Sequence, residues 1–201
     1  MTTTARIAAA KPPYSENVQA WLDRTMPKGR APFALFATLA RDERLFGRFF
    51  SGGLLDRGHL TLRQREIVIA RTTALCRSEY EWGIHIALFA QRVRFTDEQL
   101  RSLAHGDAGE SCWSDAERLL VRFCDELHAE SSVSDELWLG LRGVHSEEAL
   151  LELLLLAGFY RTVSYLTNAL RLPPEPDGAR FPTPRDLLRL EDICNDQNGR
   201  G

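Results

Sequence analysis

Apolar residues recur with the spacing of an α-helix along most of this chain. No stretch keeps the alternation of a half-buried β-strand, and few Gly/Asn pairs of the kind that close hairpins occur. We therefore predict an all-α protein. The most apolar run, LLELLLLAGFY from Leu150, is shorter than the roughly 18 apolar residues of a membrane span and contains Glu152. We interpret it as a buried or intersubunit helix and expect no membrane partner.

Residues that favour helix N-termini mark where the helices should begin. Ser15, Thr61 and Ser78 each precede a segment of helical periodicity. The predicted helices cover 15–26, 32–50, 61–76, 78–93, 96–104, 114–130, 134–144 and 146–172. The chain is thereby divided into a flexible N-terminal arm (1–14), one helical domain (15–172) and an extended tail (173–201). We expect the tail to wrap over the surface or a neighbouring subunit, with a short turn at RDLLRLED.

Composition narrows the classes of function. A chain of 201 residues with 44% hydrophobic residues is long enough for one ordinary globular core. Its net charge of −3, with the signs interspersed, offers no basic face for a phosphate backbone, so we expect no nucleic-acid partner. The four cysteines form neither a Cys-x-x-Cys pair nor a zinc pattern, and no apolar leader segment is evident. These features favour a cytoplasmic protein with reduced thiols.

The segment CRSEYEWGIH, residues 76–85, contains most of the candidate chemistry. Ser78, Glu81, Trp82 and His85 are spaced so that one side of a helix presents them together. Glu66 lies on the preceding helix among apolar residues that would partly remove its carboxylate from water. A histidine facing such an acid can move a proton at neutral pH.

The stretch LTLRQREIVIARTTALCRSEYEWGIHIALFA resembles the carboxymuconolactone decarboxylase and alkylhydroperoxidase D-like (AhpD-like) proteins. In the peroxidase branch of that family, a glutamate and a histidine nineteen residues apart flank a Cys-x-x-Cys pair. Glu66 and His85 match the two ends of this pattern, whereas Ser78 and Glu81 stand where the cysteines would be. The resemblance implies the helical AhpD-like fold and a homo-oligomer (dimer, trimer or hexamer).

The missing thiols argue against disulfide-based peroxide reduction, because serine and glutamate cannot cycle through sulfenate and disulfide. The decarboxylase branch, which does not rely on the cysteine pair, is the better match. We therefore predict a decarboxylase-like enzyme, a lyase or else an isomerase or dehydratase. It would act on a small organic substrate, such as a lactone or acid, by acid–base catalysis without a cofactor or metal. Glu66, Glu81 and His85 are the predicted catalytic residues.

The roles of the neighbouring side chains are predicted less directly. We assign Ser78, Tyr80 and Trp82 to substrate binding, although Tyr80 and Trp82 could equally be core aromatics. Glu66 and His85 could also be a structural pair, and Glu81 a solvated acid of the first helical turn. The same three ionisable groups could only just supply the ligands of a metal.

Two other functions stay open. One is an alkylhydroperoxidase-like antioxidant, in which Cys76 would have to act without a partner thiol. The other is a non-enzymatic oligomer that binds a small molecule.

Overall fold

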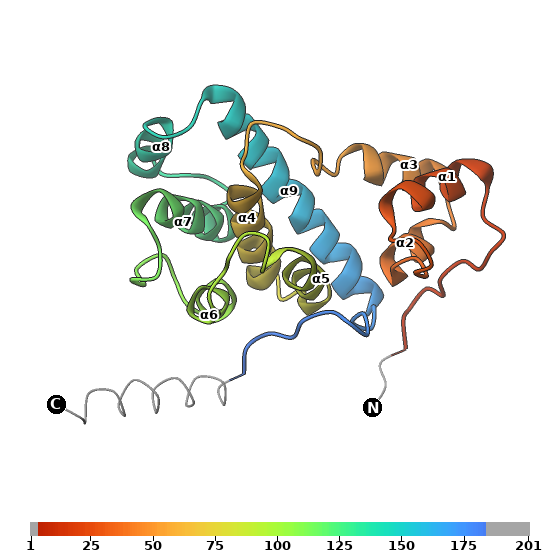
Figure 1. Ribbon diagram of the computed structural model, residues 1–201. Coiled ribbons are helices and arrows are strands. Elements are labelled where there is room, and N and C mark those ends of the chain that lie inside the picture. The colour runs from red at the N-terminus through yellow and green to blue at the C-terminus, as the bar shows by residue number, and fades with distance from the viewer. Residues whose placement is uncertain (1–3, 184–201) are drawn as a thin grey trace, which may run out of the picture.

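Every regular element of the part of the chain that the structure describes, residues 4–183 of a computed structural model, is a helix (Figure 1). The prediction of an all-α protein is confirmed. Within that range the helices are α1 (Glu16–Thr25), α2 (Ala34–Leu39), α3 (Glu43–Ser51), α4 (Leu62–Leu75), α5 (Glu79–Phe89), α6 (Asp97–His105), α7 (Asp115–Glu130), α8 (Asp135–Arg142) and α9 (Glu147–Leu170). The predicted turn at RDLLRLED lies outside the described residues.

The helices begin where side chains can satisfy the first free backbone N–H groups. Thr61 forms a capping box with Gln64 at the start of α4, and Thr96 and Ser114 form the same arrangement at α6 and α7. Ser15, Ser78, Ser134 and Ser146 cap four further predicted starts, whereas the helix after Pro32 has Phe33 at its N-terminal cap position and no side-chain cap. All of the predicted caps are confirmed because each depends only on residues within one turn.

The predicted single helix over 32–50 is wrong. The structure has two helices there, α2 and α3, and the chain breaks between them at residues 40–42. Asp42 adopts an extended conformation, and its carboxylate accepts a hydrogen bond from the backbone N–H of Leu45 at 2.9 Å. An aspartate that caps a new helix therefore overrides the continuous helical periodicity of this segment.

α4 is the centre of the core. It packs against α5, α6, α7 and α9, and Ile67, Val68, Ile69 and Ala70 are completely buried. Judged by its length and composition alone, α9 is long and apolar enough to cross a membrane. In the structure, however, Leu153, Leu156 and Val163 of α9 are part of the same buried core.

α1, α2 and α3 form a small unit on the other side of α9 from α7 and α8 (Figure 1). This unit is held by aromatic rings: Phe50 contacts Trp21, Phe36 and Phe46 with ring centroids between 4.5 and 5.3 Å apart. Phe49 extends the cluster to Phe159 of α9 at 5.2 Å. The unit therefore reaches the rest of the molecule through rings that also lie close to the candidate site.

Residues 173–183, which we call the C-terminal strap, lie over α5. Glu175 accepts hydrogen bonds from the Tyr80 hydroxyl at 2.6 Å and from the backbone N–H of Ala34 at 2.7 Å. The backbone N–H of Ala179 donates to the carbonyl of Gly83 at 3.0 Å. A Cβ at Gly83 would lie 2.3 Å from the Ala179 carbonyl oxygen, so only glycine allows this crossing.

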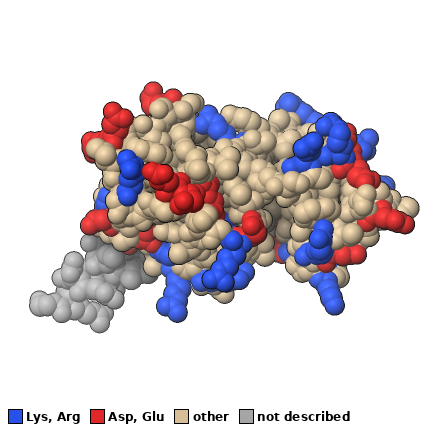
Figure 2. Space-filling view, turned by 90° about the horizontal axis from the view of Figure 1, so that it is seen from above, with Lys and Arg blue, Asp and Glu red and all other residues tan. Residues whose placement is uncertain are grey.

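Acidic and basic side chains both occur on the face shown in Figure 2. On that face they leave no uninterrupted basic surface, in keeping with the low net charge of −3.

Candidate active site

The turn between α4 and α5 brings the candidate residues of the two helices close together. Arg77 takes the left-handed conformation, with φ of 56°, and the backbone N–H of Ser78 donates to the carbonyl of Thr73 at 2.8 Å. Ser78 then caps α5. The tight reversal places the two helices side by side, so that Glu66 near the start of α4 faces His85 in the last turns of α5.

His85 lies between two carboxylates. Its Nδ1 is 2.7 Å from Glu66 Oε2, and its Nε2 is 3.4 Å from Glu81 Oε1. The hydroxyl of Tyr160, on α9, is 3.1 Å from the same Nε2. His85, Glu66 and Tyr160 are 4%, 2% and 2% exposed, so the group is almost completely removed from water.

These neighbours control the charge of the imidazole. Burial alone lowers the pKa of His85, but the charge of Glu66 and the hydrogen bonds to Glu66 and Glu81 outweigh burial and raise that pKa to about 9. His85 is therefore an imidazolium at neutral pH, with a donor N–H on each ring nitrogen. Burial, followed by the charges of Glu81 and Glu66, raises the pKa of Tyr160 well above its ordinary value, so its hydroxyl stays neutral.

The second oxygen of Glu66 is less fully used. Glu66 Oε1 lies 3.5 Å from Nε of Arg65, and both atoms are buried without a hydrogen-bond partner among the described residues. Arg65 is held from the other side by the carbonyl oxygen of Leu55, at 2.9 Å from its Nη1. The carboxylate thus keeps one acceptor position free beside the imidazolium that it neutralises.

Aromatic rings surround the imidazole. Phe89 stacks on His85 with centroids 5.5 Å apart, and Tyr160 meets its ring edge-on at 5.1 Å. Phe159 follows Tyr160 at 5.5 Å and continues to Phe49. Three of these rings, Phe49, Phe89 and Phe159, are only partly buried. The imidazole therefore borders on apolar aromatic surface, while Arg65 approaches the group only at Glu66.

Solved structures that share this arrangement of helices include proteins described as peroxidase-related and as an alkylhydroperoxidase AhpD core. The chain matches an uncharacterized peroxidase-related protein from Silicibacter sp. TM1040 with a TM-score of 0.74 and 17% identity, over 90% of this chain and 100% of that one. It matches a second such protein, from Ralstonia eutropha JMP134 and described as an alkylhydroperoxidase AhpD core, with a TM-score of 0.70 and 18% identity over 86% and 95% of the chains.

The protein has the AhpD-like fold. A further match is a variant of the debrominase Bmp8 in complex with 2,3,4-tribromopyrrole, with a TM-score of 0.70 and 14% identity over 88% of this chain and 95% of that one. The sequence itself matches no family model and no curated protein. At these identities the likeness concerns the fold, and the AhpD-like core is the part of the expectation that is confirmed.

Within this AhpD-like core, the three residues assigned to substrate binding have other partners. The Ser78 hydroxyl lies 2.7 Å from that of Thr167 and caps α5, and Tyr80 is bound by the strap through Glu175. Trp82 is 1% exposed and packs against Phe181 of the strap at 5.0 Å. The structure therefore brings Glu66, Glu81 and His85 together and places Ser78, Tyr80 and Trp82 in the framework around them.

Tyr160 was not singled out from the sequence. It lies 75 residues after His85, in a run of apolar residues where an aromatic side chain is expected to belong to the core. Its helical register is the one signal that could have found it, since Leu153, Leu156 and Val163 place residue 160 on the buried side of α9.

The described cysteines do not supply the missing thiol pair. Cys76, Cys112 and Cys124 are free thiols. Burial raises the pKa of Cys76, and burial raises that of Cys124 to about 12, so neither is activated as a thiolate. In residues 4–183, no group of three or more His, Cys, Asp and Glu is placed to hold a metal ion.

Proposed function

We propose that the protein is an acid–base enzyme of the AhpD-like fold that acts on a small organic substrate without disulfide chemistry. The observation that supports this is the position of His85 between Glu66 at 2.7 Å and Glu81 at 3.4 Å, two acids that raise its pKa to about 9. A histidine that is charged at neutral pH is a proton donor ready for use.

His85 would act through Nε2, because its contacts with Tyr160 and Glu81, at 3.1 and 3.4 Å, are longer than the 2.7 Å contact of Nδ1 with Glu66. As Glu81 takes the proton beside a substrate carbonyl, that carbon–hydrogen bond breaks and its electron pair moves into the conjugated carbonyl group. The Nε2–H bond then breaks, the proton passes to the substrate, and the neutral imidazole keeps its Nδ1–H bond to Glu66. Glu81, which now carries the proton taken from the substrate, would return it to Nε2 and complete the cycle.

Keto–enol isomerisation follows this sequence when the Nε2 proton goes to the carbonyl oxygen, and dehydration follows it when that proton goes to the departing hydroxyl, which leaves as water. In a decarboxylation the carbon–carbon bond breaks instead, CO2 leaves, His85 protonates the resulting carbanion, and solvent restores the proton on Nε2.

The charges of the side chains around His85 favour uncharged substrates over carboxylates. Glu66 and Glu81 together carry one more charge than the imidazolium, and Arg65, which offsets the difference, is engaged at Glu66 and Leu55. A substrate carboxylate beside Nε2 would meet Glu81 directly. A conjugated lactone or ketone would instead bring an acceptor oxygen to Nε2 and flat apolar surface to Phe89 and Phe159.

The test is turnover of a panel of conjugated lactones, enolisable ketones and β-keto acids, followed with solvent deuterium incorporation. His85→Ala should lower the rate of any substrate found by about 10²–10⁴-fold, the usual worth of a positioned acid. His59→Asn, a change at an exposed histidine outside the site, is the control. Equal rates in wild type and His85→Ala, with both proteins folded, would refute the proposal.

The second candidate is an alkylhydroperoxidase-like antioxidant, which the names of two matching structures favour. It predicts consumption of cumene hydroperoxide in the presence of a dithiol, and loss of that activity in Cys76→Ser. The acid–base proposal predicts no such dependence on Cys76.

We also propose that the protein is a homo-oligomer assembled through α9. Leu151 and Leu155 are 62% and 65% exposed, and with the exposed Thr162 they lie on one side of α9, at intervals of four and seven residues. The first turn of α9 is acidic, whereas Arg171 follows its last turn. An antiparallel second copy would pair these opposite charges. Leu155→Glu should then give monomers in sedimentation analysis, and unchanged mass would exclude this interface.

A further inference from the structure

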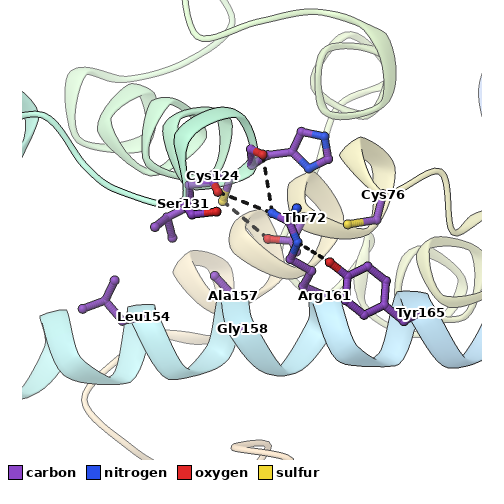
Figure 3. Close-up of a pocket in the computed structure, with 11 residues that line it drawn as sticks. Thr72, Cys76, Cys124, Ser131, Leu154, Ala157, Gly158, Arg161 and Tyr165 are labelled. Atoms are coloured by element: carbon purple, nitrogen blue, oxygen red, sulfur yellow. Dashed lines mark hydrogen bonds between the residues drawn. The ribbon is translucent and has the colours of Figure 1, made fainter.

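A second site of a different kind lies on the opposite flank of the α4–α9 contact. A cleft of about 300 Å³ opens there between α4, α7 and α9 (Figure 3). Its volume is at the lower end of the range of small-molecule pockets. Glu66, Glu81 and His85 are not among the residues that line it. The cleft is therefore separate from the proposed proton-transfer group.

The charge of this cleft is positive. Arg161 is the one permanently charged side chain among its lining residues, and no aspartate or glutamate belongs to that set. Burial, followed by the charge of Arg161, lowers the pKa of His128, which also lines the cleft, so this imidazole favours its neutral form and Arg161 carries the positive charge. Asp125 of α7, whose charge reaches His128, is paired with Arg71 at 2.6 Å. A ligand of the cleft would consequently supply the negative charge that the protein does not.

Arg161 keeps hydrogen-bonding capacity for such a ligand. Its Nε donates to the Tyr165 hydroxyl at 2.8 Å, which fixes the guanidinium in the cleft (Figure 3). Its Nη1 reaches the carbonyl oxygens of Leu127 and His128 only at 3.4 and 3.5 Å, longer than good N–H···O bonds. Within residues 4–183, no hydrogen bond uses Nη2. Two neighbouring donors are thus available to a carboxylate, which guanidinium groups bind with two parallel bonds.

The remaining wall is apolar and open. Leu127, Leu154 and Ala157 line the cleft beside Arg161. Gly158 lies in the middle of α9, where glycine is unfavourable, and a Cβ built there would meet nothing within 4 Å. The glycine is therefore not required by packing within the chain, and the space in front of it is free for a ligand.

We propose that this cleft binds a small monocarboxylate with a compact apolar or aromatic body. The carboxylate binds the Nη1 and Nη2 donors of Arg161, and the body lies against Leu154 and Gly158. The proposal is independent of the acid–base function, because the two sites share no residue.

Benzoate is a suitable probe, titrated into the intact protein by calorimetry and by ligand-observed NMR. We expect saturable binding of one benzoate per chain, and binding weaker by about tenfold or more for benzamide, which has the same shape without the charge. Arg161→Gln should weaken benzoate binding by a similar factor. Arg122→Gln is the matched control, because Arg122 is on α7 but outside the cleft.

Gly158→Leu tests the cleft without changing any charge, and should abolish benzoate binding by filling the space. His85→Ala should bind benzoate as the wild type does, so that failure of the acid–base proposal leaves this one testable. Absence of binding up to about 10 mM benzoate, equal binding of benzamide, or unchanged binding in Arg161→Gln or Gly158→Leu would each overturn the proposal. A wild-type oligomer that binds no benzoate, and that Gly158→Leu dissociates, would show that a second copy occupies the cleft instead.

Discussion

Two cations, His85 and Arg161, lie on different sides of α9, and only the first is paired with acidic side chains of the chain. Tyr160 and Arg161 are adjacent and therefore point about 100° apart around the helix. Tyr160 faces His85, whose positive charge is matched by Glu66 and Glu81 inside a closed, aromatic-lined group. Arg161 faces a cleft whose lining contains no acid at all.

The difference shows what each side can do. Where the protein neutralises the cation itself, the proton on that cation can be transferred without bringing in a counter-ion, which suits acid–base chemistry. Where the cation is left without an acid and the space beside it is open, neutralisation must come from a ligand. The proposed proton transfer at His85 and the proposed ligand binding at Arg161 rest on this difference.

The largest effect is expected on the closed side, from Glu66→Ala. Removing the acid leaves a buried imidazolium without its nearest counter-charge, which costs about 3–5 kcal/mol of unfolding free energy in comparable pairs. Urea unfolding at pH 7 measures it. Glu130→Ala, at an exposed acid of α7, is the control and should change stability by less than about 0.5 kcal/mol. A loss below about 1 kcal/mol for Glu66→Ala would mean that the pair is not a charged one.

The next effect is a dependence on pH. The folded-state pKa of His85 is raised from 6.5 to about 9. The stability that its protonation contributes is therefore complete below pH 6.5 and is lost as pH rises to about 9. The melting temperature of the wild type should fall across this window. In His85→Gln the fall should be smaller, because only other groups then titrate; equal slopes would contradict a raised pKa.

Tyr160→Phe should have a smaller effect that separates positioning from charge. It removes one hydrogen bond to Nε2 and no charge, so we expect a loss of about 1 kcal/mol. The pKa of His85, followed by NMR of the ring, should move less than in Glu66→Gln. A substrate turned over by the enzyme should show lower kcat in Tyr160→Phe if the hydroxyl orients the ring. A pKa change as large as that of Glu66→Gln would assign Tyr160 an electrostatic role instead.

The smallest effect is expected at the cleft, where Gly158→Ala should raise the free energy of unfolding rather than lower it. Gly158→Ala places a methyl group in free space and improves helix propensity, so the isolated chain should gain about 0.5–1 kcal/mol. Thermal unfolding at low protein concentration measures this gain. A destabilisation would show that residue 158 is closely packed, which would narrow the cleft and weaken the case for a ligand.

Most helix starts and the pairing of Glu66 with His85 could be predicted from the sequence, because both depend on residues that are close together along the chain. Caps such as Thr61 and Ser78 act within one turn, and Glu66 and His85 are joined by a single tight reversal. The break at Asp42 was missed, since one capping side chain there outweighs an uninterrupted apolar period.

Contacts made across the whole chain could not be predicted in the same way. Tyr160 meets His85 across 75 residues, and Glu175 meets Tyr80 across 95. No local pattern distinguishes such a tyrosine from one in the core. The surroundings of Tyr80 and Trp82 were obscured for the same reason, because the strap that covers them comes from the end of the described chain.

Glu175 has one more consequence. By accepting hydrogen bonds from both Ala34 and Tyr80, it fastens α2 and α5 with a single carboxylate contributed from beyond α9. The unit formed by α1, α2 and α3 is thus bound by a residue that is synthesised 141 positions after Ala34. The contact of α2 with this carboxylate can therefore form only after residue 175 has been made.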